Sequence, residues 1–188
     1  MSVALQKPMT FGEFLDWEER QELRYEFDGS QPQAMNGGTL RHEAIGTTLR
    51  ALLYARLRGS PCRPWGPNSK IEVHGRIRYP DAVVTCTRGR ADDTIIPAPV
   101  VVFEILSATT SRTDRIEKLR EYQATPSIQR YVILEQDSIA AMVFSRQADE
   151  WTGHALTEID VLRLPEIGVE LPLADIYADA DLDAAPSV

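Results

Sequence analysis

The stretch PVVVFEIL, residues 99–106, is almost fully apolar and sits near the middle of a chain of 188 residues. Such a run predicts a strand that is buried in a sheet. Glu104 interrupts it, and burying an unpaired carboxylate is costly or raises the pKa of the group. We therefore expect Glu104 to have a partner: a basic side chain, a hydrogen-bonding group or a metal ion. The alternative is that it lies on an exposed edge or forms an ordinary ion pair.

Helical and strand patterns alternate on both sides of this segment. The clearest predicted helix covers residues 41–59, because apolar residues recur there at helical spacing on one face. These residues are Ile45, Leu49, Leu52, Leu53 and Leu57. Further helices are expected over residues 9–20, where Thr10 and Glu13 form a capping box, and over residues 111–124. Strands are expected over residues 23–27, 31–35 (as an edge), 70–75, 77–86, 99–106, 130–135, 139–145 and 151–156, with a loop at 61–69. This order predicts a mixed α/β domain, a sheet flanked by helices.

Length and composition narrow the class of protein. The length suits a single domain, which we place at residues 1–176, followed by a small, acidic and flexible tail at 177–188. The net charge of −8 argues against a strongly basic nucleic-acid-binding domain, but metal ions allow a nuclease to be acidic. Apolar runs are far shorter than a membrane span requires, and no signal peptide is evident. We therefore expect a soluble, cytoplasmic protein without a membrane partner.

The two cysteines, Cys62 and Cys86, show no metal-binding or redox spacing. Since the chain is expected to be cytoplasmic, we predict that both are reduced rather than joined in a disulfide.

A second carboxylate, Asp81, follows Pro80 and leads into the apolar strand of residues 82–84. Taken alone, an aspartate after proline is typical of a turn or a cap. Together with Glu104 on a neighbouring strand, it could instead hold Mg²⁺, which prefers oxygen ligands.

The helix expected at residues 111–124 carries Asp114, Lys118 and Tyr122 on one side, at intervals of four. Ile116 and Leu119 mark the side that we expect to be buried. The simplest interpretation of the polar side is a surface ion pair between Asp114 and Lys118. At the start of this helix, Ser111 and Asp114 resemble a capping box.

Several short motifs, in a fixed order over residues 9–175, resemble a known family. They are MTFGEFL (9–15), RYEFDG (24–29), M-x6-H (35–42), RYPDAVV (78–84), VVFEILSATT (101–110), D-x3-K-x3-Y (114–122) and IQRYVILEQD (128–137). Pro80-Asp81 followed by Glu104-Ile105-Leu106 is similar to the signature of the PD-(D/E)XK nuclease superfamily. The whole set resembles its Uma-type family of restriction endonuclease-like proteins, which implies a restriction endonuclease-like core with extra C-terminal strands.

The sequence departs from the superfamily pattern at two positions. Leu106 stands where the signature has lysine, and the resemblance implies that Lys118 of the following helix replaces it. Ala108 stands where the family usually has proline, which we expect to alter the stiffness of a loop and not the chemistry.

The resemblance implies an endonuclease that hydrolyses phosphodiester bonds, with DNA as the expected substrate. Asp81, Glu104 and the carbonyl of Ile105 would bind Mg²⁺ or Mn²⁺, and Lys118 would assist the attacking water. A matching acid, Glu26, could extend the metal site.

Three of the matching residues leave alternatives open. Glu26 could simply pair with Arg24 or Arg41. His42 could touch phosphate at the start of its helix or have no active role. Tyr122 could position Lys118 or only pack.

Two broader alternatives also remain. The fold could persist as a catalytically silent module that binds protein or nucleic acid. Family analogy further suggests a homodimer, for which residues 140–145 and their neighbours could provide a strand edge.

Overall fold

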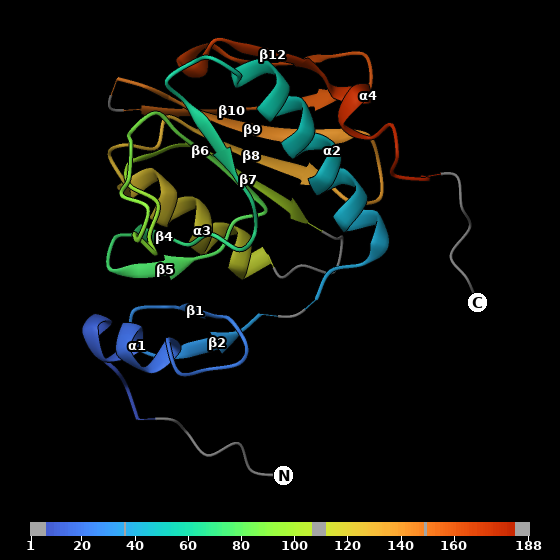
Figure 1. Cartoon of the computed structure of the whole chain (residues 1–188). Helices are drawn as coiled ribbons and strands as arrows, with labels where there is room; N and C mark the ends of the chain where they lie inside the picture. Colours follow the sequence, from blue (N-terminus) through green and yellow to red (C-terminus); the bar gives the residue numbers. More distant parts are fainter. Residues whose placement is uncertain (1–6, 36, 107–111, 149, 183–188) are drawn as a thin grey trace, which may run out of the picture.

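The fold is described from a computed structural model that covers residues 7–35, 37–106, 112–148 and 150–182, without the side chains of 112–114. A six-stranded mixed sheet forms the centre of the molecule (Figure 1), in the order β10–β9–β8–β7–β6–β3. Its strands are β3 (Arg63–Trp65), β6 (Ala82–Thr85), β7 (Pro99–Leu106), β8 (Arg130–Glu135), β9 (Ala140–Gln147) and β10 (Glu150–Thr157). Only the β7–β8 pair among these neighbours is parallel. The stretch that forms β7 is central and largely buried, as predicted.

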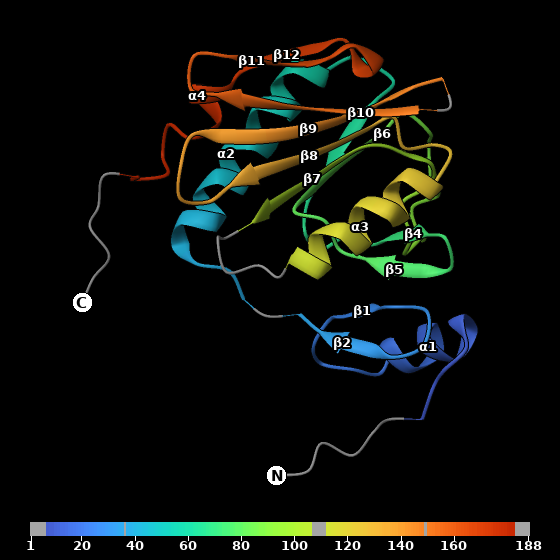
Figure 2. The ribbon, with the colours of Figure 1, turned by 180° about the vertical axis from the view of Figure 1, so that it is seen from behind.

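One face of the six-stranded sheet is covered by α2 (Leu40–Leu57) (Figure 2). The same face carries a hairpin of β11 (Val161–Leu164) and β12 (Val169–Pro172), linked by the short 3-10 helix Pro165–Ile167, and then α4 (Leu173–Ile176). The expected apolar side of α2 is buried except at Leu52, which is only partly covered. Side chains from α2 and from the sheet form one continuous hydrophobic cluster, which fixes the start of α2 beside the ends of β6 and β7.

The opposite face is covered by α3 (Arg112–Ala124) and by β4 (Ile71–Val73). Val83 and Val102 of the sheet pack there against Tyr122 of α3 and Ile71 of β4. Because side chains alternate along a strand, Glu104 shares this face with Val102. The fold therefore directs the carboxylate of β7 toward α3.

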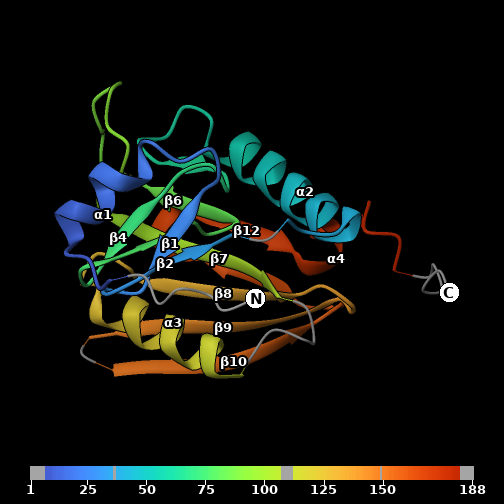
Figure 3. The same cartoon turned by 90° about the horizontal axis from the view of Figure 1, so that it is seen from below.

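A second, four-stranded sheet has the order β2–β1–β5–β4. It comprises β1 (Tyr25–Phe27), β2 (Pro32–Ala34), β5 (Arg76–Arg78) and β4, and α1 (Phe11–Glu18) packs on it. In Figure 1, α1, β1 and β2 lie below β5, and Figure 3 shows the same layer from below. The ring of Phe14 stacks on that of Phe27, with centroids 4.6 Å apart. The capping box at Thr10 and Glu13 and the edge position of Pro32 are both as predicted.

The segment 77–86, expected to form one strand, is instead divided between the two sheets. It contributes β5 to the four-stranded sheet and β6 to the six-stranded sheet, and Tyr79, Pro80 and Asp81 link them. The expected loop at 61–69 also contains the short edge strand β3. Both errors concern three- or four-residue strands, whose pairing depends on distant segments and not on local periodicity.

Residues 140–145 and their neighbours were expected to provide a strand edge, but residues 140–145 themselves do not lie at one. These residues belong to β9, which pairs with β8 on one side and with β10 on the other. The two edges of the sheet are β3 and β10, and most residues of β10, the neighbour of β9, are exposed.

The prediction of two reduced cysteines is also contradicted. Cys62 and Cys86 form a disulfide that links the residue before β3 to the residue after β6. The two strands are antiparallel neighbours, with Arg63 opposite Thr85. Their pairing brings the flanking cysteines together, which a separation of 24 residues in the sequence did not reveal.

Packing extends past the boundary expected at residue 176. Tyr177 and Ala180 are buried against α2 and the sheet, and the Tyr177 hydroxyl donates to the carbonyl oxygens of Glu135 and Ala140 at 2.9 Å. The beginning of the expected tail is therefore part of the folded domain, and residues 183–188 lie outside the described part. Among the described helices, none has the length and apolar character needed to cross a membrane.

Candidate active site

Asp81 and Glu104 lie close to one another at the ends of the neighbouring strands β6 and β7. Asp81 Oδ2 accepts a hydrogen bond of 2.7 Å from the backbone N–H of Ile105, the residue after Glu104. The N–H and C=O of a strand residue point to the same side, so the Ile105 carbonyl also faces Asp81. This carbonyl lies beyond the last β6 partner of β7, which is Ala82 opposite Phe103. Two carboxylates and one backbone oxygen thus share one end of the sheet.

The other oxygen of Asp81 faces α2. His42 Nε2 lies 3.2 Å from Asp81 Oδ1, and His42 occupies the first turn of α2, where its backbone N–H donates to Thr39 Oγ1 at 3.2 Å. Arg50, two turns further along α2, donates to the Asp81 carbonyl at 3.4 Å. Asp81 is therefore held from both sides and is not a free turn residue.

The predicted buried side of α3 is correct for Leu119, which is partly buried against the sheet, but wrong for Ile116. Ile116 is 39% exposed, whereas Lys118 is only 9% exposed and Tyr122 is fully buried. Lys118 Nζ lies 3.3 Å from both oxygens of Glu104 and 3.5 Å from Glu26 Oε1. The attraction of these carboxylates turns the polar side of α3 inward, so Lys118 is not confined to the expected surface pair with Asp114. The side chain of Asp114 and the proposed cap at Ser111 lie outside the described part.

Tyr122 combines the two roles considered for it, but with a different partner. Its hydroxyl donates to Glu104 Oε1 at 2.7 Å, and its ring packs edge-on against Tyr131, with centroids 4.7 Å apart. The hydrogen bond fixes the Glu104 carboxylate directly.

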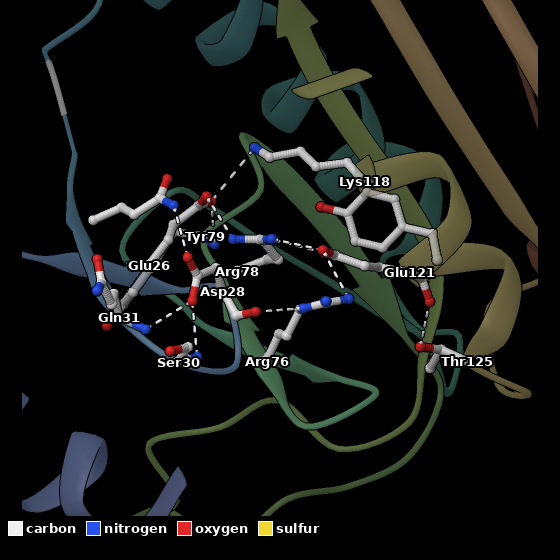
Figure 4. A network of polar contacts seen from close by, with 12 residues as sticks. Glu26, Asp28, Ser30, Gln31, Arg76, Arg78, Tyr79, Lys118, Glu121 and Thr125 are labelled. Carbon is white, nitrogen blue, oxygen red and sulfur yellow. Dashed lines mark hydrogen bonds and ion pairs between the residues drawn. The ribbon is translucent and has the colours of Figure 1, made fainter. Parts of the chain in front are cut away.

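Glu26 reaches the site from β1 and is held by Arg78 (Figure 4). Its Oε1 accepts from the Tyr79 N–H at 3.2 Å, and its Oε2 lies 3.3 Å from Arg78 Nη1. Of the two arginines suggested by the sequence, Arg24 donates to the Asn68 carbonyl and Arg41 pairs with Asp137.

Arg78 is itself held by a buried carboxylate of α3. Glu121, 3% exposed, accepts two hydrogen bonds of 2.7 Å from the Arg78 guanidinium, and Arg76 lies 3.3 Å from the same group. Figure 4 shows Glu121 between these two arginines, with Lys118 pointing toward Glu26. Sequence reasoning missed Arg78 and Glu121, although Glu121 follows Lys118 by three residues, a spacing that places both on one side of a helix.

Burial controls the ionisation of Glu104. Removal from water raises the pKa of its carboxyl group to about 7, and the charges of Asp81 and Glu26 act in the same direction. Lys118 and the Tyr122 hydroxyl oppose this shift. The hydrogen bond to Asp81 raises the pKa of His42 above its ordinary value, against the effect of burial. The site therefore holds protons more tightly than its residue types would in water.

The donor set determines which metal could fit. Within the described residues, no three His, Cys, Asp or Glu side chains are arranged to hold a metal ion by themselves. The available donors are two carboxylates, Asp81 and Glu104, and the Ile105 carbonyl that faces Asp81. Hard oxygen donors of this kind suit Mg²⁺, which keeps several waters, and also Mn²⁺. The residues present therefore fit such an ion.

The seven candidate site residues that the resemblance implies lie in one connected set of contacts: Glu26, His42, Asp81, Glu104, Ile105, Lys118 and Tyr122. They come from β1, α2, the β5–β6 link, β7 and α3.

Comparison with a solved structure identifies the fold. The chain is similar to a crystal structure described as "a putative nuclease belonging to DUF820" from Anabaena variabilis, with a TM-score of 0.75 and 17% identity. The match covers 91% of this chain and 98% of that one. The mixed sheet with its flanking helices thus has the restriction endonuclease-like fold, in agreement with the predicted α/β class.

Comparison of sequences then gives the family. Residues 11–174 match the sequence model of the Uma2 family, described as "Putative restriction endonuclease", and the chain belongs to this family. Two Synechocystis proteins are also similar: "Uncharacterized protein slr1290", 32% identical over 88% of this chain and 89% of its own length, and "Uncharacterized protein sll1609", 25% identical over 72% and 80%. Family and fold together support a nuclease.

Proposed function

We propose that the protein is a divalent-metal-dependent endonuclease that hydrolyses phosphodiester bonds of DNA at the site formed by Asp81, Glu104 and Lys118. The observation that carries the proposal is the position of Lys118, a buried ammonium 3.3 Å from both oxygens of Glu104. It supplies the lysine that the sequence lacks at residue 106. An oxygen-rich metal site beside a fixed cation would stabilise the negative charge that develops during hydrolysis of a phosphodiester.

Asp81, Glu104 and the Ile105 carbonyl would hold Mg²⁺ or Mn²⁺. When bound, such an ion supplies Lewis acidity toward the phosphate and lowers the pKa of a coordinated water. The hydrogen bond from the Ile105 N–H keeps Asp81 Oδ2 fixed at 2.7 Å, and Tyr122 keeps the Glu104 carboxylate in place. Both contacts reduce the reorganisation that ligand binding would otherwise require.

Lys118 would act on the reacting groups directly. Its compact ammonium can hold the attacking water by a hydrogen bond and stabilise the negative charge that develops on the phosphate. Glu26 lies 3.5 Å from the same ammonium and would orient it, while Arg78 and Glu121 fix Glu26. His42, hydrogen-bonded to Asp81, would carry a positive charge more readily because its pKa is raised, which favours a nearby phosphate.

The test is cleavage of supercoiled plasmid DNA by the purified protein with Mg²⁺ or Mn²⁺. Asp81→Ala, Glu104→Ala and Lys118→Ala should each lose at least about a hundredfold in rate, as expected when a preorganised charge is removed from such a site. The matched control is Glu170→Ala, which removes an exposed carboxylate that pairs with Arg163 elsewhere on the molecule.

Cleavage that survives all three substitutions would place the chemistry elsewhere. Absence of cleavage of duplex DNA, single-stranded DNA and RNA with both metals, by a folded protein, would instead favour a catalytically silent binding module. The homodimer suggested by the resemblance stays a prediction, and sedimentation or light scattering at micromolar concentration tests it.

A further inference from the structure

A cavity of about 910 Å³ lies apart from the candidate active site. Its lining comes from the end of α1 and the segment after it, from β3 and the end of β6, and from the connection before β7. The lining holds five basic and four acidic side chains, a net positive balance in a chain whose net charge is −8. The cavity therefore differs in charge from the molecule as a whole.

Three arginines of this cavity, Arg24, Arg63 and Arg88, are exposed. No carboxylate of the described residues forms an ion pair with them, whereas the buried acid of the cavity is already neutralised. Glu18 pairs with Lys70 Nζ at 2.6 Å and accepts a hydrogen bond of 2.5 Å from the Tyr79 hydroxyl. Arginine side chains without carboxylate partners are suited to phosphate, which their planar guanidinium binds through two hydrogen bonds.

Trp65 adds a flat apolar surface beside these charges. It is 46% exposed although it is a large aromatic residue, and it lines the cavity from the edge strand β3. Trp65 is opposite Val83, and Arg63 is opposite Thr85. Opposite residues of paired strands share a face, so both side chains lie on the same face of the sheet as Val83, which packs against β4 and α3. This is the face toward which Glu104 points.

The cavity and the candidate active site are joined by short segments of chain. Asp81 and Thr85 lie at the two ends of β6, about 13 Å apart at the usual rise of a strand. Tyr79 connects the two directly, because its N–H donates to Glu26 while its ring and hydroxyl belong to the cavity wall. This separation corresponds to about four stacked nucleotides.

We propose that this cavity binds an unpaired segment of the nucleic acid substrate, with a base stacked on Trp65 and phosphates bound by Arg63 and Arg88. Combining an aromatic platform with a basic wall is how proteins hold single strands without reading their sequence. The link to cleavage rests on the proposed function, but the binding itself does not.

The experiment measures fluorescence anisotropy of a labelled single-stranded DNA of about 12 nucleotides, within the usual site size, in EDTA so that no cleavage occurs. Arg63→Ala/Arg88→Ala should raise Kd at least about tenfold and reduce the slope of log K against log salt by about 1.4. The matched control is Arg56→Ala/Arg163→Ala, which removes two exposed arginines of α2 and β11 on the other face of the sheet. Under the proposal neither arginine contacts a phosphate, so the Kd of this variant should stay within about twofold of that of the unmodified protein.

Trp65→Ala should raise Kd about tenfold on ordinary DNA and have no effect on an oligonucleotide whose central nucleotides are abasic. Trp65→Phe should restore most of the affinity. Equal effects of Trp65→Ala on normal and abasic DNA would overturn the proposal. Variants that bind DNA like the unmodified protein would also overturn it, and this is the result expected if the cavity binds a protein instead.

The two proposals fail in different ways. Cleavage with an unchanged KM in Trp65→Ala contradicts the binding cavity and leaves the nuclease intact. Binding that depends on Trp65, in a protein that cuts nothing, contradicts the nuclease and leaves the cavity intact.

Discussion

Glu104 is only 4% exposed, and its carboxyl group has two fixed partners. Lys118 and the Tyr122 hydroxyl supply hydrogen bonds, but burial still raises the pKa of Glu104 to about 7. In unfolded chains, the ordinary value is 4.5. Between these two values, the folded protein binds more protons than the unfolded protein.

This difference predicts a pH dependence of stability. Without metal, the contribution of Glu104 to the free energy of unfolding is fully present below pH 4.5 and is lost as the pH rises through about 7. Urea titrations in EDTA should show that the difference between the unmodified protein and Glu104→Gln changes over this window, by at most about 3 kcal/mol. A difference that stays constant across the window would contradict the shift.

At the scale of single residues, the sequence predicted some contacts of the candidate site and missed others. Glu104 could be predicted to need a partner, because its neighbours are apolar and a buried charge must be compensated. The pairing of Arg78 with Glu121 could not be predicted, because nothing in the sequence near either residue distinguishes it from other charged residues. Only the packing of α3 on β5 brings their 2.7 Å contacts together.

At the scale of elements, the disulfide stabilises the edge strand β3 against β6. In an unfolded chain, this bond closes a loop of about 24 residues, which restricts the unfolded state and is worth roughly 3 kcal/mol. Cys62→Ala/Cys86→Ala, or reduction by dithiothreitol, should lower the free energy of unfolding by about this amount in urea titrations.

The control for this prediction is the double variant with dithiothreitol, which should have no further effect. If the unmodified protein and the double variant unfold at the same urea concentration without reductant, the disulfide does not contribute to stability.

Helix α3 explains why periodicity alone was misleading. Ile116 and Leu119 were expected to mark its buried side. Leu119 is partly buried against the sheet, but Ile116 is exposed and Lys118 is buried. Local hydrophobic patterns assume that charged residues face water. Here the carboxylates of Glu26 and Glu104, remote in the sequence, reverse that preference.

For the whole molecule, the fold class and the family could both be predicted from the order of motifs along the sequence, because each depends on many weak signals spread along the chain. The division of residues 77–86 between two sheets could not be predicted in the same way. Its strands are three and four residues long, and their partners, β1 and β7, are set by the tertiary fold.

Metal binding should stabilise the entire fold. A ligand that binds only the folded state, at a hundred times its Kd, adds about 2.7 kcal/mol, which corresponds to a rise in Tm of roughly 5–10 °C for a chain of this length. We expect Mn²⁺ to raise Tm for the unmodified protein and not for Asp81→Ala/Glu104→Ala.

The matched variant Asp92→Ala/Glu170→Ala removes two exposed carboxylates and should respond like the unmodified protein. The same rise in Tm in Asp81→Ala/Glu104→Ala would mean that the ion binds elsewhere on the molecule.

The candidate site draws its groups from β1, α2, the β5–β6 link, β7 and α3, and each of these elements packs in one of three hydrophobic clusters. A polypeptide emerging from the ribosome therefore has no complete site until residues 118–122 have been made and α3 has docked. Under the proposed function, a cell that synthesises this protein is protected from nascent and misfolded copies, because an incomplete chain cannot damage its genome.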